Sequence, residues 1–521
     1  MIKKFLAQKF LFVILIILLI GVIQKIYVTS GGNFLFNMDN ARDFVDVREM
    51  IELKKPRLIG PTSAVEGFYN GPGWYLLLAV PYIIFQGDPY GAILLMVFLW
   101  AIGGFFLMKL ASRYGFIITL AVGLLWVGSD YINLATVYSF NPNPVTFLTP
   151  LFIFLLLKYL EGKKTIYLAG AATLGGAFFN FEMNFGVFIL PIIFAVVLFS
   201  SNFKFLKTRG FWLGLIPFFV ALAPQIIFDL KHQFIMSQSV LKFLSEEAPI
   251  KEFNILTRVG EIYEDFYYVS LPSFLNNLLL LKLVALCIAL AAVIVILKKA
   301  RGINELFIVS ATVFFLPLVL YIFLPVEVNG WHLGAEIVGL IILFALSLAQ
   351  LSKYHFAGRV AAILIAGFCI FISINNIYTF IVSKQTVNND PSLYKNEIDA
   401  IDYTYQKSEG KNFKAYVYLP SVIDYPYQYL FWWYGLKKYG FTPEDYAYLP
   451  NKPTYIDNKE FFVKPKKNAD SSGLVFLIKE PDRINIRHLW QNSFAKLEKV
   501  GNVKLRGIEI ETLKDGEIIN F

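Results

Sequence analysis

The sequence predicts a polytopic α-helical membrane protein with a small external α/β domain at its C-terminus. Of the 521 residues, 57% are hydrophobic and only 16% are charged. Apolar runs of roughly 16 to 25 residues recur along the chain, which is the length of a membrane span. Lys and Arg gather in short clusters between these runs, and the last part of the chain is polar with strand-like segments. Together these observations exclude an ordinary soluble domain.

Eleven apolar runs are long enough to be transmembrane helices. In chain order they are Phe10–Val28, Pro89–Leu110, Phe116–Leu134, Val145–Leu160, Ile166–Asn180, Phe185–Phe199, Phe211–Phe228, Phe274–Leu297, Leu306–Leu324, Leu333–Leu351 and Val360–Ile381. The first run follows Lys3 and Lys4 and could instead be a cleaved signal peptide. It is long for one, and no small-x-small cleavage site follows it, so a retained anchor is favoured.

The distribution of Lys and Arg along the chain indicates the membrane topology. The net charge of +9 comes from Lys and Arg clusters that alternate with loops poorer in these residues, so every cluster can be cytoplasmic at once. This arrangement predicts a cytoplasmic N-terminus and an external C-terminal domain, and it argues against a nucleic-acid partner. The apolar segment Gly71–Phe85 would invert all later loops if it crossed the membrane. Because it is short and contains Pro81, it is expected to be a juxtamembrane or re-entrant helix on the outer face.

Two domains follow from this topology. Residues 1–385 form the transmembrane domain, with external loops at 29–86 and 229–272, and residues 386–521 form the external α/β domain. The external domain has strand-like runs at AYVYL, GLVFLIKE and VKLRGIEIETL. Its aromatic run Tyr425–Gly435 is expected to pack on the bilayer or the domain core, with acceptor binding as the lesser alternative.

The stretch MDNARDFVDVREM lies just after the first span, on the outer face. At about 100° per residue, Asp39, Asp43 and Asp46 fall on one face of a helix. One interpretation is a surface helix whose solvated acids are partly offset by Arg42 and Arg48, with Asp39 as a first-turn acid. The other is a site in which carboxylates converge near the lipid headgroups.

The order of several motifs supports the second interpretation. DNARD at 39–43 is followed by IGPTS, NGPGWY, SFNPNP and PQIIFDLKHQF, in a chain that ends with an external domain. In this respect residues 1–385 resemble the GT-C superfamily of membrane glycosyltransferases, in particular its protein-mannosyltransferase-like and RgtA/B/C/D-like branch. In that family an acidic motif in the first external loop precedes a Gly-Pro element. Asn40 stands where many relatives have Glu, so Asp43 or Glu182 would have to supply a second carboxylate for any metal.

The resemblance implies transfer of a hexose or pentose from a polyprenyl-phosphate donor to an acceptor hydroxyl on the outer face, with inversion at the sugar carbon. Such a donor already has a good leaving group, so transfer needs an aligned acceptor and one base. By family position Asp39 is expected to be the base, and Asp43 to assist it or to bind the sugar. The residues assigned to substrate binding are Arg42, Glu66, Tyr69, Glu182, Lys231, His232 and His332.

Several of these residues also have a purely structural interpretation. Glu182 could simply cap the sixth span, and each His could be an interfacial hydrogen-bonding group. The four histidines have no zinc-binding spacing, and Cys287 and Cys369 lie inside apolar runs, so no dedicated zinc site, thiolate metal site or disulfide is indicated. No cofactor is assigned, and dependence on a divalent metal is left open.

Two other classes of function remain as alternatives. A polytopic transporter or flippase of envelope lipids or glycans would have as many spans, but it usually buries charged residues near the midplane. A non-catalytic envelope scaffold needs no site at all. The expected partners of the transferase are its lipid-linked donor, a lipid, glycan or protein acceptor, and membrane lipids. The sequence leaves open which sugar is moved and to which acceptor.

Overall fold

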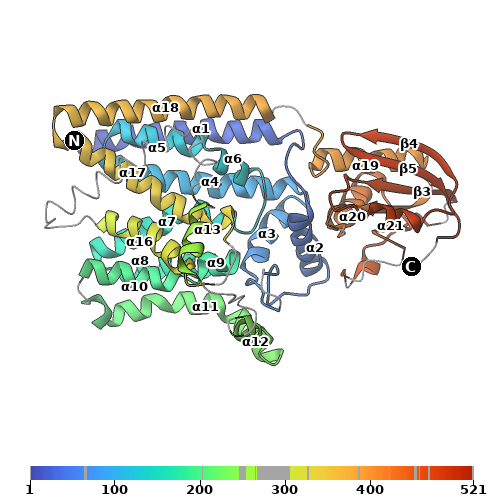
Figure 1. Ribbon diagram of the computed structural model, residues 1–521, viewed down its shortest axis with the longest axis horizontal. Coiled ribbons are helices and arrows are strands. Elements are labelled where there is room, and N and C mark those ends of the chain that lie inside the picture. The colour runs from blue at the N-terminus through green and yellow to red at the C-terminus, as the bar shows by residue number, and fades with distance from the viewer. Residues whose placement is uncertain are drawn as a thin grey trace. The chain divides into compact units, whose positions relative to one another are not determined.

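The computed structural model describes the chain apart from residues 1, 64–66, 202–203, 244, 246–253, 265, 267–304, 325–327, 385–387, 422, 451–454, 457, 468–469 and 519–521. The described residues form two compact units. The helical unit comprises residues 1–26, 57–77 and 95–383, and the sheet unit comprises residues 27–56, 78–94 and 384–521. Figure 1 labels the elements of both units.

Helices make up most of the chain up to residue 384. They are α1 (Ile2–Thr29), α2 (Met38–Glu52), α3 (Gly73–Ile84), α4 (Tyr90–Ala111), α5 (Phe116–Gly128), α6 (Asp130–Thr136), α7 (Asn143–Gly162), α8 (Thr165–Phe181), α9 (Met183–Gly186), α10 (Ile189–Ser201), α11 (Arg209–Lys231), α12 (Ile235–Lys242), α13 (Ile255–Glu264), α16 (Glu305–Tyr321), α17 (Gly334–Tyr354) and α18 (Phe356–Lys384).

Within the described residues, seven helices are long and apolar enough to cross a membrane, or up to eight if a bent pair counts as one span. The bent pair is α5 and α6, which sequence analysis took as a single span and which turn by 54° at Ser129. The Ser129 side chain accepts a hydrogen bond from the Ile132 backbone and so starts a new helix. The predicted span Phe274–Leu297 lies outside the described residues, and α3 and α16 are shorter apolar helices.

Small residues allow helices of the helical unit to approach closely. Helices α7, α8 and α11 pack side by side in it (Figure 1). A Cβ added to Gly176 of α8 would lie only 2.5 Å from the Cβ of Ala221 in α11. Close contact of this kind is how membrane helices gain van der Waals energy without a hydrophobic driving force between them.

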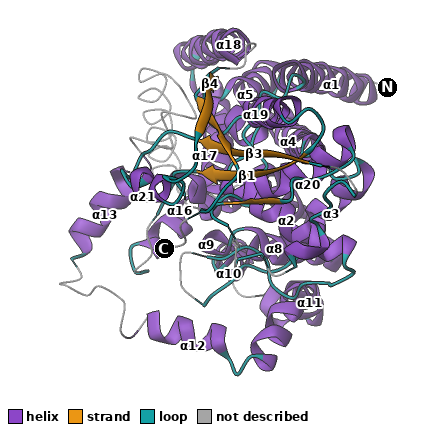
Figure 2. Cartoon of the chain, turned by 90° about the vertical axis from the view of Figure 1, so that its right-hand side faces the viewer, coloured by secondary structure: helices purple, strands orange, loops and turns teal. Residues whose placement is uncertain are grey.

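The sheet unit contains a five-stranded sheet with the strand order β2-β1-β3-β5-β4. Its strands are β1 (Asn412–Tyr418), β2 (Asp445–Ala447), β3 (Ser471–Lys479), β4 (Lys499–Leu505) and β5 (Ile508–Lys514), and its helices α19 (Tyr394–Lys407), α20 (Tyr425–Tyr439) and α21 (Arg487–Asn492). Strand β1 pairs in parallel with β2 and β3, whereas β5 is antiparallel to β3 and β4. Figure 2 draws the strands in orange and labels β1, β3 and β4.

The run VKLRGIEIETL is a hairpin of two strands, not one continuous strand. Strand β4 ends at Leu505 and β5 begins at Ile508, and the turn between them places Arg506 and Gly507 at positive φ. Glycine adopts this conformation at little cost, which is why the chain can reverse there.

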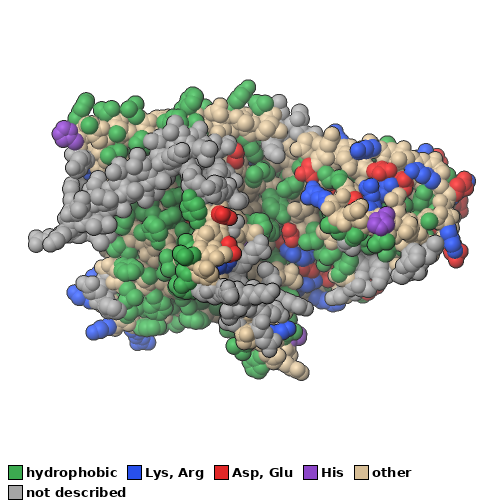
Figure 3. Space-filling view, viewed as in Figure 1, with side chains coloured by type: hydrophobic (Ala, Val, Ile, Leu, Met, Phe, Trp, Pro, Cys, Tyr) green, Lys and Arg blue, Asp and Glu red, His purple; other side chains and the backbone are tan. Residues whose placement is uncertain are grey.

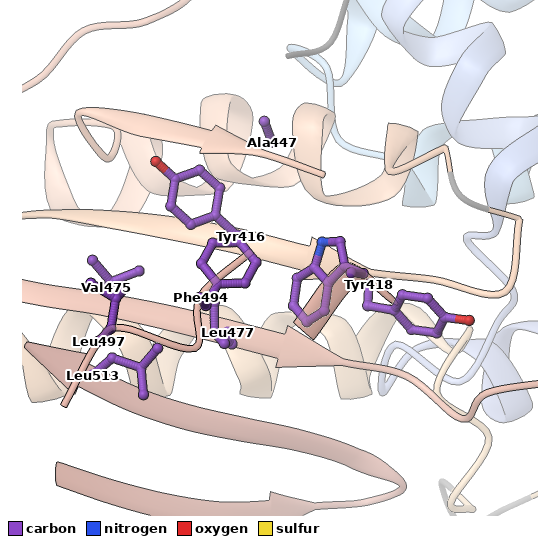
Figure 4. Close-up of a cluster of buried hydrophobic side chains, with 9 residues drawn as sticks. Tyr416, Tyr418, Ala447, Val475, Leu477, Phe494, Leu497 and Leu513 are labelled. Atoms are coloured by element: carbon purple, nitrogen blue, oxygen red, sulfur yellow. The ribbon is translucent and has the colours of Figure 1, made fainter. Parts of the chain in front are cut away.

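Tyrosine, tryptophan and leucine side chains fill the core on one side of the sheet. Tyr416 and Tyr418 of β1 belong to this cluster together with Leu477 of β3 (Figure 4). The ring of Tyr416 stacks on Phe494, and that of Tyr418 contacts Trp490. Charged side chains gather on the surface of the sheet unit, whereas hydrophobic ones cover the helices (Figure 3). These features confirm the predicted class, a polytopic helical membrane protein with a small C-terminal α/β domain.

Candidate active site

The start of α2 carries two of the predicted carboxylates and an arginine between them. Asn37 caps this helix by accepting a hydrogen bond from the Asp39 backbone, and this fixes where the first turn begins. Arg42 donates from Nε and Nη2 to Oδ1 of Asp43, at 3.1 and 2.9 Å, and its Nη1 lies 3.5 Å from Oδ1 of Asp39. One guanidinium therefore holds both carboxylates of this helix face.

The two aspartates differ in their access to solvent. The Asp43 side chain is completely buried, whereas that of Asp39 is 35% exposed. A buried carboxylate is stable only when it is paired and hydrogen-bonded, and Arg42 provides both for Asp43. Asp39 keeps an open side toward solvent, and Asp46, two turns further along α2, is half-buried.

A second group of polar residues surrounds the NGPG segment of the helical unit. Asn180 of α8 accepts a hydrogen bond from the Gly73 backbone at 3.1 Å and donates to the carbonyl of Ala221 in α11. Asn70 accepts from the backbone of Met183 at 3.3 Å, and Gln225 donates to the Tyr69 carbonyl. The segment is thus fixed to three helices, α8, α9 and α11.

Glycine is required in this segment because the backbone passes so close to Asn180. A Cβ at Gly71 would lie 1.9 Å from Oδ1 of Asn180, and one at Gly73 would lie 2.8 Å from its Cβ. Both distances are far below van der Waals contact. The sequence signature NGPGWY therefore reflects a backbone that must dock without side chains.

Glu182 and His332 belong to one network with Asn184 between them. Glu182 caps the short helix α9 by accepting from the Asn184 backbone at 3.0 Å, and burial raises the pKa of Glu182 to about 7. Nδ1 of His332 accepts from the Asn329 backbone. Nε2 of the same ring lies 2.9 Å from Nδ2 of Asn184.

The predicted phosphate-binding residues of the PQIIFDLKHQF segment lie at the end of α11. Lys231 and His232 are exposed there. The ring of His232 stacks on Phe228 with centroids 4.0 Å apart, and Phe228 also contacts Tyr69 at 5.9 Å. Tyr69 and His232 thus share one aromatic neighbour. Glu66 lies outside the described residues.

Sequence analysis missed two buried charged residues within the apolar helices. Lys25 of α1 is fully buried, donates to Oδ1 of Asn133 at 2.9 Å and lies 4.0 Å from the ring centroid of Trp100. Glu336, in the first turn of α17, is also fully buried, and in the described part of the chain its carboxylate oxygens have no hydrogen-bond partner. In the sequence, Lys25 and Glu336 each appear only as a single charged residue near the end of an apolar run.

No group of three His, Cys, Asp or Glu side chains that could hold a metal ion occurs among the described residues. At the candidate site Asp43 is held by Arg42, and Glu182 accepts from the Asn184 backbone.

No protein-family model matches the sequence, and no curated protein matches it either. Two solved structures do share its architecture: ArnT from Cupriavidus metallidurans in the apo state, and the same protein bound to undecaprenyl phosphate. The first has a TM-score of 0.55 and 12% identity over 98% of each chain, and the second a TM-score of 0.57 and 12% identity over 97% of each chain. ArnT is a glycosyltransferase of the GT-C superfamily.

The chain has the GT-C fold. The likeness covers 98% of this chain, so it is not confined to one of the two units. It confirms the fold that the order of motifs from DNARD to PQIIFDLKHQF led us to expect. At 12% identity the likeness concerns the fold, and the activity is considered next.

Proposed function

We propose that this GT-C protein is a membrane glycosyltransferase that moves a sugar from a polyprenyl-phosphate donor to an acceptor hydroxyl. The observation that carries the proposal is a likeness, over 97% of both chains, to a protein solved with undecaprenyl phosphate. The motif order and the carboxylate–arginine group of α2 support it independently. A polyprenyl phosphate has one phosphate and a long apolar tail, which suits a site between apolar helices.

The contrast between Asp39 and Asp43 supports Asp39 as the general base. A base must reach the hydroxyl proton that it removes, and Asp39 is the more accessible of the two carboxylates. Asp43 accepts two hydrogen bonds from Arg42 on Oδ1 and its side chain is fully buried, so an acceptor hydroxyl has less access to it than to Asp39. In this proposal Asp43 positions Arg42, and Asp39 takes the proton as the acceptor oxygen attacks the sugar carbon.

The leaving phosphate requires cations or hydrogen-bond donors. Arg42 is proposed to supply one through Nη1, the guanidinium nitrogen nearest Asp39. Lys231 and His232 are exposed at the end of α11 and are proposed to contact the phosphate or its carrier. Attack by the acceptor from the face opposite this phosphate is a single displacement and inverts the sugar carbon. The sugar is a hexose or a pentose in this proposal.

Donor specificity tests the proposal directly. Purified protein in nanodiscs is given radiolabelled undecaprenyl-phosphate hexose, undecaprenyl-phosphate pentose or the corresponding nucleotide sugars, with a membrane extract as the source of acceptor. We expect transfer from a lipid-linked donor only. Transfer from a nucleotide sugar without a lipid carrier would contradict the proposal, and movement of intact donor across the membrane without consumption would identify a flippase.

The chain is a multi-pass membrane protein, and we propose that its N-terminus is cytoplasmic and its C-terminal domain external. Single cysteines are introduced at Ser63 and Ser472 after replacement of Cys287 and Cys369 by serine. Both positions should react with a membrane-impermeant maleimide in intact cells. Reaction at either position only after permeabilisation would refute this topology.

A further inference from the structure

A cavity of about 550 Å³ lies within the sheet unit and has no role in the mechanism above. It is formed by the end of α2, the second half of α3 and the aromatic face of α20. Its walls include Glu52, Tyr82, Ile83, Gln86, Trp433 and Lys437. Its size is within the range of small-molecule sites, and its lining combines aromatic and aliphatic surface with a few polar groups.

The wall of this cavity after α3 is held rigidly. The Gln86 carbonyl accepts from Nε1 of Trp433 at 2.8 Å, and the Gly87 carbonyl accepts from the Tyr429 hydroxyl at 2.6 Å. Gln86 has a φ of 53°, an unfavourable conformation for a residue with a side chain. A Cβ at Gly87 would lie 2.8 Å from Cδ1 of Trp433. Strain and close packing at one turn are characteristic of pre-formed binding sites.

The polar groups of the cavity suit a ligand rich in hydroxyl groups. Glu52 accepts from the Tyr82 hydroxyl at 3.1 Å and, as a carboxylate, has further lone pairs for hydroxyl donors. Lys437 lies 4.6 Å from the Trp433 ring centroid and 3.7 Å from Asp88. The positive charge of Lys437 is balanced by the carboxylates of Asp88 and Glu52. The cavity therefore has no excess of positive charge that would bind a phosphate.

The cavity also lies beside surface that suits a membrane interface. Val80, Ile83 and Ile84 of α3 are 52%, 60% and 66% exposed, although all three are aliphatic. Tyr82 and Trp433, on the cavity wall, are of the residue types that concentrate where lipid meets water. A ligand seated here would be a polar group held close to the bilayer surface.

We propose that this cavity binds a saccharide ring of the acceptor, so that the acceptor is a glycan or carries one. The ring's C–H face packs on the walls provided by Trp433 and Ile83, and its hydroxyl groups donate to Glu52 and accept from Lys437. The role of this saccharide as the acceptor rests on the proposed glycosyl transfer. Binding of saccharide by the cavity is measurable without any transfer.

A matched pair of variants tests the assignment. Ile83→Trp places a large side chain at the cavity wall, whereas Ile84→Trp makes the same change one residue further on, outside the lining. Both side chains are well exposed, so both variants should fold. Binding is followed by saturation-transfer NMR on protein in nanodiscs, with methyl glucoside, maltose and diacetylchitobiose as probes.

We expect at least one probe to bind the wild type and Ile84→Trp equally, and to bind Ile83→Trp at least about tenfold more weakly. In transfer assays Ile83→Trp should raise the KM for acceptor, whereas Ile84→Trp should leave it near the wild-type value. If no sugar is transferred at all, the proposed glycosyl transfer is wrong. The NMR experiment would still show whether the cavity binds a saccharide. Absence of saccharide binding, equal binding in both variants, or signals from phospholipid headgroups alone would overturn the assignment.

Discussion

Arg42 donates two hydrogen bonds to a single oxygen of Asp43, at 3.1 Å from Nε and 2.9 Å from Nη2. Asp43 is fully buried, so this contact offsets the cost of removing its carboxylate from water. It also fixes the guanidinium, whose Nη1 is then directed to Asp39. The three residues form a unit in which only one carboxylate remains accessible to a substrate.

Replacing Asp39 tests the assignment of the base. Asn has nearly the same shape as Asp but cannot take up the acceptor proton, so Asp39→Asn should lower kcat by ~10²–10⁴-fold. Donor binding and the thermal unfolding temperature should change little, because Asp39 is partly exposed and makes only a long contact to Arg42. Initial rates with saturating lipid-linked donor measure the effect.

Asp46→Asn is the matched control for this change. Asp46 lies on the same helix and is half-buried, but it has no assigned role in proton transfer. The activity of the Asp46→Asn variant should stay within about twofold of wild type. Equal, mild losses in Asp39→Asn and Asp46→Asn would mean that these acids are only surface charges.

Asp43→Asn should act through Arg42. The variant keeps an oxygen that can accept from the guanidinium but removes the charge that holds it, so the arginine loses its fixed orientation. We expect a lower unfolding temperature and an apparent KM for donor raised by about tenfold, with a smaller loss of kcat than in Asp39→Asn. The combination with Arg42→Met should add little to either single change. Additive losses would show that the two residues act separately.

Much of the fold could be predicted because its signals are local. Apolar runs of span length, basic clusters and the strand-like runs at β1 and β3 each depend only on neighbouring residues. The helix at MDNARD was likewise foreseen, and its cap by Asn37 uses the adjacent residue. The break at Ser129 and the turn at Gly507 had local signals too, the Gly-Ser-Asp and Arg-Gly steps, but continuous hydrophobic patterns on both sides obscured them.

The polar contacts of the helical unit could not be predicted, because they join residues far apart in sequence. Asn180 appears as one polar letter at the end of an apolar run, and nothing near it indicates that it accepts from Gly73 or donates to Ala221. Lys25 and Asn133 are 108 residues apart and meet only in the folded chain. The proximity of such groups depends on helix packing, which the hydrophobic pattern does not determine.

Gly71 provides a test of that packing. Gly71→Ala would bring a Cβ to within 1.9 Å of Oδ1 of Asn180 and 2.9 Å of Oε1 of Gln225, so side chains or backbone must shift. Overpacking of this kind costs roughly 1–3 kcal/mol, and we expect a lower unfolding temperature and loss of activity. Gly162→Ala is the control, because nothing lies within 4 Å of an added Cβ there. Equal stability of the two variants would exclude close docking of the NGPG segment.

The last prediction concerns Glu480, which follows β3 in the sheet unit and is only 3% exposed. Burial, aided by the charge of Asp390, raises the pKa of Glu480 to about 8, against the opposing effects of the Tyr427 hydroxyl, 3.4 Å away, and of Arg483. Glu397, fully buried beside it, also has a pKa raised by burial and by the charge of Glu480.

Because the folded pKa of Glu480 lies above its value of about 4.3 in an unfolded chain, its contribution to stability is complete below that pH and is lost as the pH rises to about 8. The loss should be on the order of a few kcal/mol. Glu480→Gln removes this titration, so the unfolding temperature of the variant should fall less between pH 5 and pH 9 than that of wild type. Exposed Glu460→Gln should retain the wild-type slope. Parallel pH profiles for wild type and Glu480→Gln would show that this carboxyl is ionised in the folded protein throughout the range.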